Sequence, residues 1–287
     1  MKKILVPSDL SDISENALTL AVDIANKMQA DIYLVNFVDH PYGKSFTASG
    51  DADAKYGDEQ NLFTIQLIRK NHERLGNMAD RAALDSNEIY YEVFDEDFEE
   101  GINIYVEEKG IDLIVMGTTG EETLEEFFTG NHTEQVIQQV NCPVISVKER
   151  YHPVGFDHIV LGIDLKQDGK DDFAKAFAYI NALSTGLGAK MDVVHVADPS
   201  SKNHDVLKDQ LVDFSQRHGL LNYNVTVTEN RDKERGLIAF AHAKGASLLA
   251  VLTHVEGGFF RVFSHSTSEE ITKESDIPVL TINLHNI

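Results

Sequence analysis

Residues 2–39, KKILVPSDLSDISENALTLAVDIANKMQADIYLVNFVD, decide the fold, because residues 157–198 repeat their pattern as DHIVLGIDLKQDGKDDFAKAFAYINALSTGLGAKMDVVHVAD. Each copy reads as an apolar strand, a turn that contains aspartate, an amphipathic helix and a second apolar strand. Two further segments recur in the same order: GIDLIVMG and NCPVISV of the first copy correspond to GASLLAVL and DIPVLTI of the second. The chain is therefore expected to contain two structural repeats.

The spacing of these segments places the domain boundary. Both Gly117 to Pro143 and Leu252 to Pro278 span 26 residues, whereas the first repeat as a whole carries about 20 extra residues. We assign the extra residues to DHPYGKSFTASGDADAKYGDEQ, which has no apolar period and reads as a solvated loop or as a lid over a ligand. We predict a domain boundary near Tyr151, which gives domains 1–150 and 151–287.

Apolar runs of four to six residues alternate with amphipathic stretches in each repeat. In SENALTLAVDIANKMQ, for example, alanine, leucine and isoleucine recur at helical spacing. Short, nearly continuous apolar strands between such helices indicate a parallel sheet that is covered on both faces. The fold class predicted is therefore α/β: two repeated, open, parallel-sheet α/β sandwich domains. Ligands of such sheets bind beyond the carboxyl ends of the strands, where the strand order reverses.

Composition excludes several classes of partner. The chain of 287 residues has a formal net charge of −22, and residues 1–150 carry 29 acidic and 12 basic side chains. Such a chain repels nucleic-acid backbones and anionic lipid, so neither is expected as a partner. The sequence shows no apolar run long enough to cross a bilayer, no signal peptide, and one cysteine, Cys142, expected as a buried apolar side chain. We expect a cytoplasmic protein.

The first strand ends at Pro7, Ser8 and Asp9. Ser11 and Asp12, which follow, are suited to capping the next helix. Asp9 instead stands at the tip of the strand, facing the expected crevice. Its carboxylate either accepts hydrogen bonds from a ribose or an adenine amino group, or serves the turn alone.

Three glycines follow the strand IDLIVM, with the spacing Gly117-x2-Gly120-x9-Gly130. Glycine lets a ligand approach the backbone closely, although any one of the three is also explained by a tight turn. Residues 131–140, NHTEQVIQQV, read as a helix whose first amides point into the same crevice, and Asn131 adds a side-chain donor. The spacing predicts a cradle for phosphate groups.

These residues together resemble the universal stress protein family in its tandem two-domain form. The Pro-Ser-Asp turn, the G-x2-G-x9-G loop and the final CPV strand carry the resemblance, which covers essentially the whole chain. It implies a Rossmann-like, adenine-nucleotide alpha hydrolase-like fold, an intramolecular pseudo-dimer with PVISV and PVLTI near the shared face, and ATP as ligand, with Mg²⁺ as a further candidate. Carried over by position, it implicates Pro7, Ser8, Asp9, Phe37, Met116, Gly117, Gly120, Gly130, Asn131 and His132.

Two features set this sequence apart from the family pattern. The residue after the third glycine is Asn131 where the family usually has serine or threonine, and four glutamates occupy positions 121, 122, 125 and 126. Each such charge about 10 Å from a phosphate costs roughly 0.4 kcal/mol in water, which Mg²⁺ would offset. In the second repeat Leu252, Val255 and His265 replace the glycines, although Asp164 still corresponds to Asp9. ATP is therefore expected in the first repeat alone.

No enzyme motif accompanies the cradle. The sequence lacks a P-loop, G-x-S-x-G and H-E-x-x-H, and the glycine loop contains no lysine or arginine. We expect no catalysis beyond slow ATP hydrolysis, and the missing lysines argue against a ligase or nucleotidyltransferase. Histidines 195, 254 and 265 could converge beside Asp164, but they lack the local spacing of a dedicated zinc site, so no metal site is predicted.

Two hypotheses remain at this point. In the first, ATP binds the first repeat, orders the segment 42–61 and changes a surface that an unidentified protein partner reads. In the second, the paired domains form a stress-response scaffold or binding module that needs no nucleotide. The sequence leaves open whether two chains associate as a homodimer.

Overall fold

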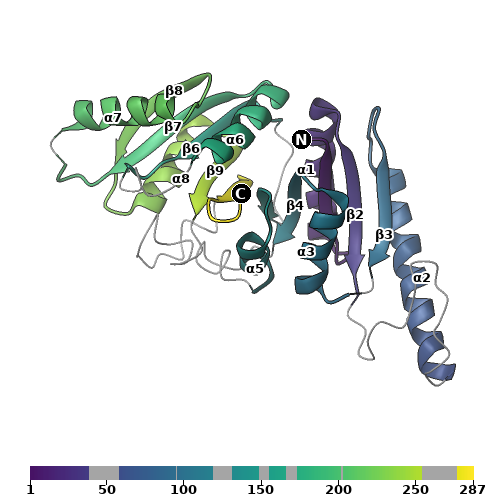
Figure 1. Cartoon of the computed structure of the whole chain (residues 1–287). Coiled ribbons are helices and arrows are strands. Elements are labelled where there is room, and N and C mark those ends of the chain that lie inside the picture. The colour runs from purple at the N-terminus through teal and green to yellow at the C-terminus, as the bar shows by residue number, and fades with distance from the viewer. Residues whose placement is uncertain are drawn as a thin grey trace. The chain divides into compact units, whose positions relative to one another are not determined.

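The structure is a computed structural model that describes residues 1–38, 58–94, 96–118, 131–148, 155–165, 173–201, 203–253 and 277–287, without the side chains of 58–64 and 131–134. Described strands and helices alternate through each repeat, except that the last two strands of the second repeat follow one another among the described elements (Figure 1). The first repeat contains β1 (Lys3–Pro7), α1 (Asp12–Met28), β2 (Asp31–Phe37), α2 (Asp58–Arg81), β3 (Ile89–Phe94), α3 (Phe98–Lys109), β4 (Leu113–Thr118), α5 (Asn131–Gln139) and β5 (Val144–Lys148). The second contains β6 (His158–Gly162), α6 (Ala174–Leu187), β7 (Lys190–Ala197), α7 (His204–Arg217), β8 (Tyr223–Glu229), α8 (Lys233–Lys244), β9 (Leu248–Thr253) and β10 (Val279–Asn283).

The chain folds into two compact units, residues 1–117 and 118–287. In the first unit the strands are ordered β3-β2-β1-β4 and run parallel. In the second unit the order is β5-β10-β9-β6-β7-β8, and these strands are parallel except for β5, which runs antiparallel to β10. The prediction of a mostly parallel α/β fold that covers the chain in two repeats is confirmed. The domain boundary near Tyr151 lies outside the described residues and stays a prediction.

Helix α1 shows how the sequence specifies an element. Ser11 caps its N-terminus, the side chain accepting a hydrogen bond from the Ser14 amide, and two acidic residues in the first turn complement the helix dipole. Its apolar residues recur every three or four positions, and Leu20 and Ile24 are fully buried. Burying a side chain of that size stabilises the fold by about 1.5–3 kcal/mol, so this face fixes α1 against the sheet.

The last strands of the two repeats pair with each other inside the second unit. Val144 of β5 lies opposite Thr281 of β10, and the Ser146 hydroxyl donates to the Val279 carbonyl at 3.3 Å. The Asn283 side chain also donates to the Ile137 carbonyl, at 3.1 Å. The expectation that PVISV and PVLTI meet is therefore confirmed.

The segment that we expected as a loop ends earlier than predicted. Residues 58–60 already belong to α2, which has 24 residues, whereas the matching helix α7 of the second repeat has 14. Part of the extra length of the first repeat is therefore helical. Residues 39–57 lie outside the described residues. Figure 1 shows α2 alongside β3, and the two elements are in contact.

Tyr105 of α3 provides a test of packing in the first unit. Its side chain is 1% exposed, and its hydroxyl donates a hydrogen bond to the Glu92 carboxylate. Burial raises the pKa of Tyr105, and the hydrogen bond and negative charge of Glu92 raise this pKa further. The neutral phenol is thus favoured in the folded state, so its contribution to stability is complete below the pKa of an unfolded tyrosine, about 10, and is lost above it.

We therefore expect the free energy of unfolding to fall as the pH rises above about 10. Chemical denaturation across this range would measure the slope for the wild type and for Tyr105→Phe. The variant should lose less stability with rising pH, because its ring cannot ionise. Equal slopes for the two proteins would show that Tyr105 is not the group responsible.

Candidate functional site

The candidate site lies where β1 and β4 end. In the first unit β1 has β2 on one side and β4 on the other, so the chain connections diverge between β1 and β4. The two strands are parallel, and their carboxyl ends share one edge of the sheet. This is the position at which open α/β sheets bind ligands.

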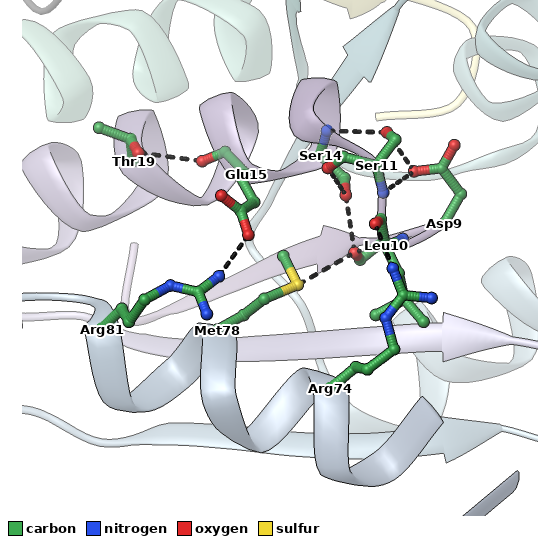
Figure 2. A network of polar contacts seen from close by, with 10 residues as sticks. Asp9, Leu10, Ser11, Ser14, Glu15, Thr19, Arg74, Met78 and Arg81 are labelled. Atoms are coloured by element: carbon green, nitrogen blue, oxygen red, sulfur yellow. Dashed lines mark hydrogen bonds and ion pairs between the residues drawn. The ribbon is translucent and has the colours of Figure 1, made fainter. Parts of the chain in front are cut away.

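The turn after β1 holds Asp9 at the surface. Asp9 is exposed, and its Oδ1 accepts hydrogen bonds from the Ser11 amide at 3.0 Å and the Ser11 hydroxyl at 2.5 Å. Between them, Leu10 has φ of 65°, in the left-handed region that a branched residue rarely adopts. Figure 2 shows these residues joined by hydrogen bonds at the start of α1. The carboxylate is thus held in a defined turn.

Pro7 and Ser8 have internal roles in the structure. Pro7 ends β1 and lies opposite Val35 in the register with β2. Ser8 is 5% exposed; its hydroxyl lies 2.8 Å from that of Ser14 and accepts from the Leu10 amide at 3.1 Å. Its main contribution is to order the turn that presents Asp9.

Helix α2 contacts the same turn, which the sequence did not reveal. Asn36 donates to the Ser8 carbonyl at 2.7 Å, and Asn71 of α2 donates to the Asn36 side-chain oxygen at 2.9 Å. Arg74 donates to the Leu10 carbonyl at 2.9 Å (Figure 2). A signal existed for Asn36, a polar residue inside an apolar strand. Nothing local marks the two α2 residues, because Arg74 bonds the turn from 64 positions away and Asn71 bonds Asn36 from 35 positions away.

Phe37 lies at the end of β2 in an aromatic cluster. Its ring centroid is 5.5 Å from that of Phe98 and 5.8 Å from that of Phe94, both in edge-to-face geometry. A Cβ on Gly101 of α3 would come within 2.9 Å of the Phe37 ring, so the absent side chain lets the helix approach. Phe37 therefore packs β2 against α3 at the edge where the candidate site lies.

At the end of β4, Met116 is buried and Gly117 is packed against α1. A Cβ on Gly117 would lie 2.6 Å from Ile13 Cγ2 and 2.8 Å from the Ile13 carbonyl oxygen. Gly117 does not have a positive φ, so its backbone conformation does not itself require glycine. Close packing of α1 on β4 thus accounts for this glycine without a ligand. Thr118, which the sequence reasoning missed, is also buried.

The rest of the predicted phosphate cradle falls largely outside the described part of the chain. Gly120 and Gly130 lie outside it, as do the four glutamates between them. Asn131 and His132 are the first two residues of α5, but their side chains are not described. The structure therefore describes the β1 side of the candidate site and the start of the β4 side.

The second repeat makes matching hydrogen bonds between the end of its first strand and its second strand, with different side chains. The Ile163 amide donates to the Val194 carbonyl at 2.9 Å, as the Ser8 amide donates to Val35 at 2.8 Å. His195 Nδ1 lies 2.9 Å from the Ile163 carbonyl oxygen, which corresponds to the bond from Asn36 to Ser8. Because a carbonyl only accepts, this bond assigns the proton to Nδ1.

Asp164 differs from its counterpart Asp9 in burial. It is 7% exposed, and its Oδ2 accepts a hydrogen bond from Lys233 Nζ at 2.8 Å. The structure thus places an internal cation at the strand end of the second repeat. Leu252 is buried in β9, whereas positions 255 and 265 lie outside the described residues.

Among the described residues, no group of three or more histidine, cysteine, aspartate or glutamate side chains is arranged to hold a metal ion. None of the described helices combines the length and apolar character needed to cross a membrane.

Comparison with known proteins identifies the family. The model of the universal stress protein family matches residues 1–148 and again residues 155–283. A universal stress protein of Methanocaldococcus jannaschii is 32% identical over 153 residues, 52% of this chain and 82% of that protein. One of Staphylococcus haemolyticus is 28% identical over 155 residues, 54% of this chain and 89% of that protein.

The fold recurs in a solved structure of the same family. The crystal structure of a universal stress protein from Archaeoglobus fulgidus aligns over 98% of this chain and 96% of its own, with a TM-score of 0.62 and 17% identity. At that identity the likeness shows the fold alone. Since the family model matches both repeats across most of the sequence, the chain belongs to the universal stress protein family and carries two copies of its domain in tandem.

Proposed function

We propose that the first repeat binds ATP at the carboxyl ends of β1 and β4, and that the protein is a stress-response regulator that catalyses no reaction or hydrolyses ATP slowly. One observation carries this proposal: Asp9 is an exposed carboxylate held by Ser11 at the strand end where such sheets bind ligands. The family resemblance of the glycine spacing supplies the choice of ATP.

The chemistry of Asp9 fits a nucleoside. An ionised carboxylate has about four acceptor positions, and the two bonds described from Ser11 both use Oδ1. Ribose hydroxyls and the adenine amino group are donors that such an oxygen accepts. Phe37 and Met116 would line the base side, and the backbone from Gly117 through Gly120 and Gly130 to Asn131 and His132 would face the phosphates. Mg²⁺ would offset the glutamate charges.

The biological setting is part of the same proposal. We place the protein in the cytoplasm, where a protein partner distinguishes the ATP-bound form from the free form. A surface near residues 42–61 is the candidate for this readout. Slow hydrolysis would then reset the signal, since the glycine loop contains no lysine or arginine to stabilise a transferring phosphoryl group.

A second candidate function is a scaffold or binding module that needs no nucleotide. One observation favours it: Gly117 and Ser8, two of the residues assigned to the ligand, are explained by contacts inside the protein. In this case the strand-end turn would be a structural feature alone. The melting temperature would then be the same with and without Mg-ATP.

Thermal unfolding with Mg-ATP distinguishes the two candidates. Ligand at about 100 times its dissociation constant should stabilise the wild type by about 2.7 kcal/mol. Asp9→Ala should weaken binding about tenfold, because hydrogen bonds to charged groups contribute about 1.5–3 kcal/mol. Native mass spectrometry of the purified protein would report any retained nucleotide and whether the chain is a homodimer.

The matched control is Asp12→Asn. Asp12 is exposed, begins α1 three residues after Asp9, and gives the same change in net charge. It should retain the affinity of the wild type for Mg-ATP. If Asp9→Ala and Asp12→Asn bind equally well, Asp9 does not contact the nucleotide, and if the wild type shows neither retained nucleotide nor stabilisation, the scaffold is the better reading.

A further inference from the structure

One face of α2 follows the turn that presents Asp9. Asn71, Arg74 and Met78 have the spacing i, i+3 and i+7, which places them on the same side of a helix. Met78 is buried, with its sulfur 4.0 Å from the Ser8 hydroxyl oxygen. The turn is therefore packed against α2 along about two helical turns.

Arg74 contacts the most strained residue of the turn. Leu10 has φ of 65°, a conformation that is unfavourable for a residue with a Cβ. Its amide is bound by the Ser8 hydroxyl, and its carbonyl accepts a charge-assisted hydrogen bond from Arg74 Nη2 at 2.9 Å. Both polar groups of the strained peptide thus have partners, and one partner is on α2 (Figure 2).

Asn71 reaches the same turn through a partly buried relay. Its side-chain amide donates to Asn36, and Asn36 in turn donates to the Ser8 carbonyl. Asn36 is 6% exposed, so the inner bond is shielded from water, and the outer bond is half-buried. In the second repeat His195 makes the corresponding bond to Ile163. The inner bond is thus common to both repeats, and α2 contributes the outer one in the first.

We propose that Asn71 and Arg74 are positioning residues for the candidate nucleotide site: they hold the Ser8–Leu10 turn in its strained form, so that Asp9 is presented in a fixed position. This inference rests on the proposed function, because the ligand concerned is the same ATP. The same contacts would couple the packing of α2 to nucleotide binding. Because coupling between two sites is reciprocal, nucleotide binding tightens the α2 contacts, and loosening α2 weakens nucleotide binding.

The test compares Arg74→Ala, Arg74→Lys and Asn71→Ala with Arg81→Ala. Arg81 is the matched control, because it lies on the same helix, makes an ion pair with Glu15 of α1, and does not touch the turn (Figure 2). Calorimetry should show Mg-ATP affinity reduced about fivefold by Arg74→Ala and by Asn71→Ala, the lower end of usual coupling. Arg74→Lys should recover part of the loss, and Arg81→Ala should bind as the wild type does.

A second measurement needs no ligand. Amide hydrogen exchange of Leu10 and Ser11, followed by NMR in the free protein, should be faster in Arg74→Ala than in Arg81→Ala. Wild-type affinity in both Arg74→Ala and Asn71→Ala would overturn the positioning role and leave the proposed function standing. If the wild type does not bind Mg-ATP, the proposed function fails, and unchanged exchange in Arg74→Ala would then overturn the positioning role as well.

Discussion

Gly117→Ala is expected to lower the free energy of unfolding of the first unit by about 2–3 kcal/mol, the upper part of the range of about 1–3 kcal/mol for adding volume to a packed site. The new Cβ would stand 2.8 Å from the Ile13 carbonyl oxygen and 2.9 Å from its carbonyl carbon. Both atoms are backbone of the first turn of α1, so no side-chain rotation relieves the overlap. The helix must move away from β4. Urea denaturation without nucleotide would measure the change.

Gly110→Ala is the matched control in the same unit. Gly110 ends α3 with φ of 63°, and a Cβ there meets no atom within 4 Å. Its substitution should cost about 1 kcal/mol, from backbone strain alone. A loss in Gly117→Ala no greater than in Gly110→Ala would contradict the packing explanation. If the explanation holds, any effect of a larger residue at 117 on ATP binding includes unfolding, so Asp9 is the better position for testing the ligand.

The repeated architecture could be predicted because its signals are local. Apolar runs such as ILV and LIVM and the helical spacing of α1 occur within a few residues of each other, and the repeat supplies a second copy of each. The strand-end position of Asp9 follows from the same pattern. The order of the strands then identifies the edge at which a ligand would bind.

The contacts that shape the candidate site could not be predicted, because they join distant positions. The spacing of Gly117 with two later glycines predicts contact with a ligand, whereas its neighbour in the structure is Ile13, more than 100 residues earlier. The sequence around Arg74 predicts no role for this side chain, which lies outside the glycine loop. Only the crossing of α2 over the turn brings its guanidinium to Leu10.

The aspartates of the two repeats show the same limit. Asp9 and Asp164 occupy equivalent positions in the sequence, yet one is exposed and the other is buried in an ion pair. Their surroundings differ at the first residue of the helix that follows the third strand of each repeat. That residue is Phe98 in α3, where it packs on Phe37, and Lys233 in α8, where it binds Asp164. Two residues at equivalent positions in the sequence can therefore have different contacts, and the sequence alone does not show which contacts each one makes.

Lys233→Ala is therefore expected to lower the free energy of unfolding of the second unit by about 3 kcal/mol, the lower end of the cost of breaking a buried ion pair. The side chain of Asp164 is 4% exposed, so removing the ammonium group takes this positive charge away from a shielded carboxylate. Lys233 itself is 25% exposed at its side chain, which lets water offset part of the loss. Denaturation with urea, followed by a probe in the second unit, would measure the change.

Two further variants separate the charge from the packing. Arg231→Ala removes the same charge from an exposed position two residues earlier and should change stability by less than about 0.5 kcal/mol. The double variant Asp164→Asn with Lys233→Met keeps similar volumes without either charge, and it should recover most of the stability lost in Lys233→Ala, because replacing both members of a buried pair is often neutral. A double variant as unstable as Lys233→Ala would mean that the lysine stabilises this strand end by packing, and that its bond to Asp164 contributes little.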